Sequence, residues 1–184
     1  MVVLHVKSST SSSSSSPSPP PPEVEEEIEF LYECAATAAV ADVAAALAGT
    51  AGLQARVLSL CRRLQARVLS LCRRLRERCP SGELERALSE AEAYASKVQV
   101  RHNKFVSPRA LREHIKNIEK TAANALADNS EALCPQHPKS DEKRDSIQLW
   151  WAGKELAMDK KLSDYIGVND KTKIVIRLSL PTSL

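Results

Sequence analysis

The stretch QLWWAGKELAMDKKLSDYIGVNDKTKIVIRLS, at residues 148–179, decides the fold of this chain of 184 residues. It contains short apolar segments at 149–151 and 174–178, with a Gly-containing segment at 152–156 and a mixed segment at 162–165 between them. Adjacent residues of a strand point to opposite faces of a sheet. One of Trp150 and Trp151 therefore belongs to the core, and the other lies outside it.

The first 52 residues predict a second pair of strands and a short helix. Apolar residues alternate in residues 1–7 and again in 28–34, which is the period of half-buried strands. Residues 8–22 between them are mostly Ser and Pro, a composition that favours a solvated loop. A helical pattern then begins at Val40, and we expect Gly49 and Gly52 to end it.

A duplicated segment follows. The sequence LQARVLSLCRR occupies residues 53–63 and, letter for letter, residues 64–74. Eleven residues make almost three turns of α-helix, so the repeat keeps its apolar residues on one face. The duplication is thus expected to lengthen a helix by about 16 Å without breaking its apolar stripe.

Two more helices are expected after the repeat. Leu84 opens a narrow apolar seam that should pack antiparallel to the duplicated helix. Ser107 has the place of an N-cap, Pro108 that of a first helical residue, and Val106 is placed to contact Leu111. Residues 127–146 are polar and predict a linker. The expected domain organisation is a first half-sheet at 1–52, a helical insert at 53–126, the linker at 127–146 and a second half-sheet at 147–184.

The C-terminal pieces are similar to the second half of ubiquitin, in its strand, its Ala-Gly-Lys-x-Leu turn, its Leu-Ser-Asp-Tyr segment and its closing strand. The resemblance implies an α+β fold: a ubiquitin-like β-grasp, with element order ββαββ, split by a long α-helical insert between Gly52 and Ser146. Both halves must close on one helix, because neither can bury its apolar face alone. In the ubiquitin register, Trp151 is core and Trp150 lies on the open face of the sheet.

Trp150 is therefore a candidate partner-binding residue, because an exposed Trp often anchors a protein interface. Coverage of Trp150 by the helical insert is the alternative. Lys154 matches a ubiquitin linkage lysine and is otherwise an ordinary turn lysine. A conjugated modifier needs a C-terminal Gly-Gly, and this sequence ends in RLSLPTSL, so we expect no conjugation.

A narrower resemblance extends over both ends and the middle of the chain. The segments MVVLHVK, EFLYECAAT, LWWAGKEL, KKLSDYIG and NDKTKIVIRL, with the helical residues 84–126, resemble the Kurly family of cilia- and flagella-associated proteins. The resemblance implies a non-catalytic adaptor for ciliary motility. It would be a cytoplasmic factor, associated with the cilium, flagellum or basal body, that supports outer dynein arm assembly. Its expected partners are dynein-assembly factors or chaperone-associated proteins. The alternative is a general adaptor of the ubiquitin, proteasome or chaperone systems.

The net charge of +3 is unevenly distributed. Residues 23–33 contain six Glu and no basic residue, whereas residues 53–79 contain eight Arg against Glu77 alone. The Arg-rich helix offers further candidate partner-binding residues, Arg56, Arg63, Arg67 and Arg74. Arg beside an apolar stripe is also how an ordinary amphipathic helix stays soluble. We expect no nucleic-acid binding, because no aromatic residues are interleaved with these Arg.

We expect no catalytic residue, cofactor, metal or small-molecule substrate. No phosphate-binding Gly-rich loop is present, and Cys134 and His137 have the spacing of only half a metal site. The five cysteines include no Cys-x-x-Cys, and Met1 leads directly into a strand pattern, which together predict a reducing compartment. No membrane partner is expected, because no apolar run approaches the length of a membrane span.

Overall fold

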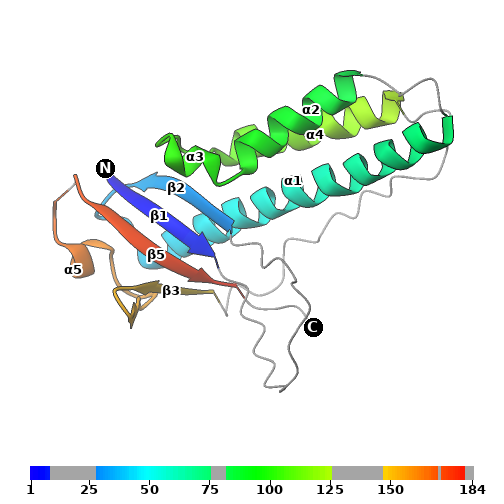
Figure 1. The fold of residues 1–184 in the computed structure, drawn as a ribbon. Coiled ribbons are helices and arrows are strands. Elements are labelled where there is room, and N and C mark those ends of the chain that lie inside the picture. Colours follow the sequence, from blue (N-terminus) through cyan, green and yellow to red (C-terminus); the bar gives the residue numbers. More distant parts are fainter. Residues whose placement is uncertain (9–27, 76–81, 126–146, 170, 181–184) are drawn as a thin grey trace, which may run out of the picture.

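A five-stranded sheet with a long helix across one face forms the body of the molecule, and this helix continues into a helical arm (Figure 1). The computed structural model describes residues 1–8, 28–75, 82–125, 147–169 and 171–180, without the side chains of residues 71, 74 and 75. The predicted Ser/Pro loop beyond Ser8 and the predicted linker at 127–146 therefore lie outside the described residues. The mixed α+β class predicted from the sequence is confirmed.

The sheet has the strand order β2-β1-β5-β3-β4. The strands are β1 (Val2–Ser8), β2 (Ile28–Cys34), β3 (Gln148–Trp151), β4 (Lys154–Glu155) and β5 (Lys173–Ser179). The central strands β1 and β5 are parallel, and the other neighbours are antiparallel. The sheet thus joins the two ends of the chain, as the apolar patterns predicted, because β1 and β5 bury their alternate residues on the same face.

The main core lies between this sheet and α1 (Val40–Leu75). From the strands it contains Val2, Leu4, Val6, Phe30, Leu149, Ile174, Ile176 and Leu178, and from the helix Val40, Val43, Ala44, Leu47 and Ala51. Each strand contributes every second residue, which is the pattern of a sheet covered on one side. The opposite face of the sheet is left more open and is the first place to look for a functional surface.

The predicted end of the first helix at Gly49 and Gly52 is wrong. Helix α1 continues through both glycines for 36 residues, and it runs across the boundary expected at residue 52. A glycine inside a helix costs about 1 kcal/mol relative to Ala, which burial of an amphipathic face readily outweighs. Here Leu47 and Ala51 are buried on that face beside the two glycines.

The arm consists of α1, α2 (Gly82–Ala95) and α4 (Pro108–Ala125), which pack against one another, with α3 (Val98–Arg101) at the turn (Figure 1). Helix α2 runs antiparallel to α1, as predicted. Helix α4 begins at Pro108, also as predicted, and its first backbone bond joins Leu111 N to Ser107 O at 3.1 Å. A short helix, α5 (Ser163–Ile166), lies between β4 and β5.

The part of α1 from Val40 to Ser70 is long and apolar enough, by length and composition alone, to cross a membrane. The expectation that no segment approaches this length is therefore wrong for α1. In this fold one face of it is buried against the sheet, α2 and α4, with Leu47, Val57 and Leu64 among the buried residues. This burial is typical of the central helix of a packed domain, which passes the same test of length and composition.

Candidate functional site: the open face of the sheet

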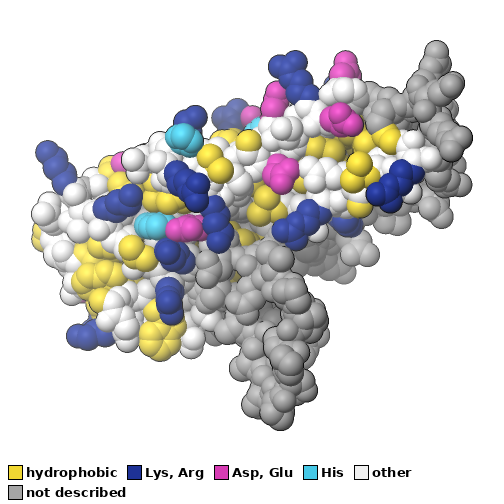
Figure 2. Space-filling model, in the orientation of Figure 1, with side chains coloured by type: hydrophobic (Ala, Val, Ile, Leu, Met, Phe, Trp, Pro, Cys, Tyr) yellow, Lys and Arg dark blue, Asp and Glu magenta, His cyan; other side chains and the backbone are white. Residues whose placement is uncertain are grey.

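The open face is the side of the sheet that points away from α1. Its strands present Val3, His5 and Lys7 from β1, Glu29, Leu31 and Glu33 from β2, Gln148 and Trp150 from β3, Glu155 from β4, and Lys173, Val175 and Arg177 from β5. Figure 2 views this face, where Lys and Arg side chains surround a central pair of one His and one acidic side chain. We name these twelve residues the open face.

The two tryptophans divide between the two sides of the sheet. Trp151 is half-buried and packs against the core, whereas Trp150 is 36% exposed on the open face. This is the arrangement that the ubiquitin register implied, with Trp151 toward the core and Trp150 outside it. Trp150 lies opposite Arg177 on β5 and Glu155 on β4, so it stands between a basic and an acidic neighbour.

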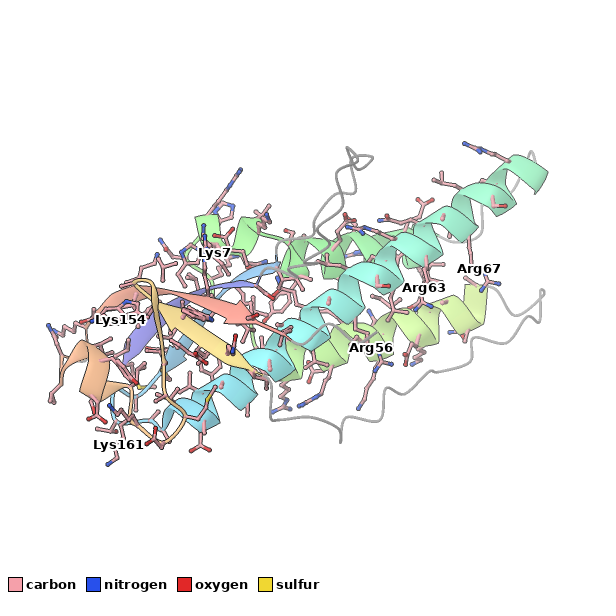
Figure 3. All side chains as sticks on the ribbon, turned by 90° about the horizontal axis from the view of Figure 1, so that it is seen from below. Lys7, Arg56, Arg63, Arg67, Lys154 and Lys161 are labelled. Carbon is pink, nitrogen blue, oxygen red and sulfur yellow. The ribbon has the colours of Figure 1, made fainter. Side chains whose placement is uncertain are left out.

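A tight turn brings Lys154 beside the tryptophans. Ala152 and Gly153 connect β3 to β4 with φ angles of 49° and 80°. Two successive positive φ angles match the right-handed twist of a two-residue hairpin. The turn pairs Trp151 with Lys154 and leaves the Lys154 side chain exposed at the edge of the sheet (Figure 3).

One flank of the open face is covered. Leu31 lies on this face by strand alternation, yet it is only 1% exposed. The segment after α3 runs along β2, where Phe105 pairs with Leu31 and Val106 N donates to Leu31 O at 3.4 Å. The segment thereby occupies part of the free edge of β2, which protects it from pairing with another chain.

A polar cluster joins β1 and β2 on the open face. His5 Nε2 is 2.5 Å from Glu29 Oε1, and Lys7 Nζ is 3.6 Å from the same oxygen. Burial by itself would raise the pKa of Glu29, but the hydrogen bond from His5 and the charges of Lys7 and His5 outweigh it, so the pKa is lowered. Glu29 therefore stays ionised on this face. The sequence placed His5 on this face but did not reveal its partner.

Gln54 connects this region to the arm. It is buried, and its Nε2 donates to Ala95 O of α2 at 2.6 Å and to Glu29 O of β2 at 3.3 Å. Its Oε1 is buried and has no hydrogen-bond partner among the described residues. The side chain thus joins the sheet, α1 and α2 at one point, which we name the junction.

The predicted Arg candidates lie in the arm, apart from the open face. Figure 3 shows Arg56, Arg63 and Arg67 along α1, whereas Lys7 and Lys154 lie on the sheet. Arg56 pairs with Glu119 of α4 at 3.3 Å, so its charge contributes to packing within the arm. Arg63 is exposed and Arg67 half-buried, while the side chain of Arg74 lies outside the described residues. The structure therefore does not bring Trp150 and the Arg residues into one site.

The described thiols are poorly suited to nucleophilic chemistry. Burial raises the pKa of Cys34, and burial with the nearby Glu92 charge raises the pKa of Cys61 to about 11. Cys72 is disulfide-bonded, which departs from the expectation of wholly reduced cysteines. Within the described ranges no group of three or more His, Cys, Asp or Glu is placed to hold a metal. Cys134 and His137 lie outside those ranges.

The C-terminal segment of the chain matches a known protein family. The family model for cilia- and flagella-associated protein 298 matches residues 147–183, which include β3, β4 and β5. Half of the chain is also similar to curated proteins of that name. The rat protein is 30% identical over 109 residues, and a protein of Xenopus laevis, cilia- and flagella-associated protein 298-B, is 31% identical over 109 residues. The Drosophila melanogaster protein is 53% identical over 32 residues.

These matches cover 52% of this chain in rat and Xenopus laevis, and 38% and 40% of the respective relatives. The chain thus spans well under half the length of these relatives. No solved structure matches it. The resemblance predicted from the paired end motifs is nevertheless confirmed: in its C-terminal strands and over half of its length, this chain is similar to cilia- and flagella-associated protein 298.

Proposed function

We propose that the chain is a non-catalytic adaptor in ciliary or flagellar motility, acting in the cytoplasm to support assembly of outer dynein arms. The observation that carries the proposal is the similarity of half the chain to proteins named as cilia- and flagella-associated. The family match falls on the strands that carry Trp150 and Arg177, which supports the open face as the contact surface. Its partners in this proposal are dynein-assembly or chaperone-associated proteins.

The proposed fold is a ubiquitin-like β-grasp that is split by the arm. The strand order, the parallel central pair β1 and β5, and the crossing of one face by α1 support this arrangement. The arm departs from a compact β-grasp, because α1 continues far beyond the sheet and packs with α2 and α4. A rigid sheet with an open face is a suitable platform for binding another protein, since little side-chain or backbone order is lost on binding.

The non-catalytic part of the proposal rests on what the reactive groups do. His5 and Glu29 bond to each other, and the free thiols Cys34 and Cys61 are buried with raised pKa values. The indole of Trp150, in contrast, makes no hydrogen bond within the described part of the chain, and the residue is partly exposed. An exposed Trp among charged residues is more typical of a protein contact than of a catalytic centre.

The test introduces the gene for this chain into a ciliated or flagellated cell from which the cell's own copy has been removed. The full chain and the variants Trp150→Ala and Met158→Ala are expressed at equal levels. Met158 is the matched control, because it is also 36% exposed but lies in the segment after β4, off the open face. We expect the unchanged chain and Met158→Ala to restore beating and outer arms in electron micrographs, and Trp150→Ala to fail. Outer arms that are normal in the cells without the gene would refute the proposal.

The same cells distinguish the ciliary function from the alternative function. An affinity purification that recovers ubiquitin-chain or proteasome factors, lost on Trp150→Ala, would favour a general adaptor of the ubiquitin system. The specific observation behind this alternative is the open sheet face with an exposed aromatic residue. Recovery of dynein-assembly factors, again lost on Trp150→Ala, supports the ciliary function.

A further inference from the structure

Charges on the open face are sorted by strand. The basic residues Lys7, Lys173 and Arg177 lie on the two central strands, β1 and β5. The acidic residues lie on the edge strands, Glu29 and Glu33 on β2 and Glu155 on β4. A basic stripe therefore runs along the middle of the face, between two acidic borders.

The positive charge of this stripe is poorly compensated. Lys7 shares Glu29 with His5, which is the closer partner of that carboxylate. Arg177 makes no ion pair or side-chain hydrogen bond within the described part of the chain, and Lys173 reaches only the neutral Asn103 Oδ1, at 3.5 Å. Structural ion pairing among the described residues thus does not explain why the basic residues are grouped here, since two of the three have no carboxylate partner there.

Apolar surface accompanies the stripe. Val175 lies between Lys173 and Arg177 on the same face of β5 and is 50% exposed. Trp150 lies directly across from Arg177 on β3. A ligand that lies along β5 would meet Lys173, Val175 and Arg177 in turn, with Trp150 beside the last of them.

The dimensions fit one polypeptide segment. Two strands about 4.8 Å apart, with their side chains, give a stripe about 10 Å wide, which is close to the diameter of an α-helix with side chains. Lys173 and Arg177 are four residues apart in a strand, so their positions differ by about 13 Å. A wider ligand would reach the acidic borders at Glu33 and Glu155. A nucleic acid would place phosphates there, at a cost in repulsion.

We propose that the open face binds an acidic protein segment that carries an apolar side chain, with its carboxylates on Lys173 and Arg177 and its apolar residue against Val175 and Trp150. The inference rests on the proposed function in taking the open face as the contact surface of an adaptor. It adds the chemistry of the partner. Arg suits this role, because its guanidinium can bind a carboxylate through two hydrogen bonds, and the adjacent Trp provides the apolar contact.

The test uses two fluorescently labelled synthetic peptides. One alternates Glu with Leu, and the other has Lys in place of every Glu. Binding to the full chain is measured by fluorescence anisotropy at low salt, for the unchanged chain and for two double variants. Lys173→Glu/Arg177→Glu reverses the stripe. Lys116→Glu/Lys120→Glu changes the net charge equally on exposed residues of α4 and is the control.

We expect the stripe variant to weaken binding of the Glu peptide by at least about tenfold and to gain binding of the Lys peptide. The control variant should change either affinity by less than about twofold. Equal loss in both variants would show an effect of net charge alone and would overturn the proposal. So would equal binding of both peptides by the unchanged chain, or tighter binding of an RNA or DNA duplex than of the Glu peptide.

Failure of this inference and failure of the proposed function are distinguishable. If Trp150→Ala abolishes outer arms in cells while the stripe variant binds the Glu peptide normally, the adaptor function stands and the acidic partner is wrong. If the stripe variant loses the Glu peptide while cells without the gene have normal arms, the partner chemistry stands and the ciliary function is wrong.

Discussion

The two copies of LQARVLSLCRR have the same sequence and lie in the same helix, yet their side chains have different surroundings. In the first copy Gln54 is buried at the junction, and Leu58 packs against the core. In the second copy the equivalent Gln65 bonds to Glu92 near the surface, and Leu69 is 59% exposed. Position along α1, and the neighbours found there, therefore decide what each residue contributes.

The difference has a geometric cause. The first copy passes the place where the sheet, α2 and α4 all meet α1, as the contacts of Gln54 and Arg56 show. The second copy lies farther out in the arm, where the sheet no longer covers the helix (Figure 1). Only the residues nearest the bundle axis, such as Val57 and Val68, are buried in both copies. Both copies therefore bury the apolar stripe, whereas the positions beside the stripe differ in burial between the two copies.

The largest expected effect compares Gln54→Ala with Gln65→Ala. Gln54→Ala leaves the buried carbonyl of Ala95 and the part-buried carbonyl of Glu29 without this donor, which should lower the free energy of unfolding by about 3 kcal/mol. Gln65→Ala removes an exposed hydrogen bond and should cost less than about 0.5 kcal/mol. Urea unfolding of both variants measures the difference. Equal costs would mean that the two copies are energetically alike and that the junction has no special role.

The next comparison uses the cysteines of the two copies. The pKa of Cys61 is raised to about 11 from 9.0, so at neutral pH its thiolate fraction is about a hundredfold below that of an unshifted thiol. Cys72 is half-buried and disulfide-bonded. After mild reduction of the folded chain, we expect iodoacetamide to modify Cys72 faster than Cys61, because Cys61 is buried and its thiolate is scarce.

The identical sequences of the two copies limit how the reaction rates of Cys61 and Cys72 can be measured. Cleavage after Arg yields the same peptide, VLSLCR, from both copies, so a digest does not distinguish the two thiols. The variants Cys61→Ser and Cys72→Ser each leave one repeat cysteine and solve this problem. Similar rates in the two variants would show that the first copy is not buried as the structure has it. Unfolding the chain in urea should make the two rates equal, which is the control.

The sequence revealed elements whose signal is local. Strand alternation placed β1 and β2, short motifs similar to ubiquitin placed β3 and β5, and the Ser107–Pro108 signal placed the start of α4 to the residue. All three signals depend on neighbours within a few residues along the chain. The prediction that Gly49 and Gly52 end the first helix was wrong, because a helix end also depends on tertiary burial, which competes with local propensity. Nothing in one copy of the repeat shows that the other copy will be less buried.

For a related reason, only part of the candidate site could be predicted from the sequence. Strand alternation showed only that Trp150 and Trp151 face opposite sides of the sheet, and the resemblance to ubiquitin implied which of them faces outward. The pairing of His5 with Glu29 needs the register of β1 against β2, and the two strands are separated by nineteen residues whose length sets no register. The burial of Leu31 needs the position of Phe105, which is much farther away in sequence. Contacts between segments that are far apart in the sequence could not be predicted from it.

The smallest expected effect tests whether the junction is coupled to the open face through Glu29. The backbone carbonyl of Glu29 accepts from Gln54, and its side chain accepts from His5. Because the folded state lowers the pKa of Glu29 below 4.5, its ionised form contributes stability above that pH. This contribution is lost as the pH falls through the lowered pKa. We expect it to be no more than about 1 kcal/mol, since the cluster is partly exposed.

The measurement compares urea unfolding at pH 6 and pH 3 for the unchanged chain, Glu29→Gln and Glu33→Gln. Glu33 is the matched control, because it lies on the same face of β2, is exposed, and makes no ion pair within the described part of the chain. Glu29→Gln should lose less stability on acidification than the unchanged chain, whereas Glu33→Gln should lose as much. If all three lose the same amount, the His5–Glu29 pair contributes nothing to folding. The hydrogen bond from Gln54 to the sheet would then depend on the Glu29 backbone and not on its charge, and charge changes on the open face would leave the arm unaffected.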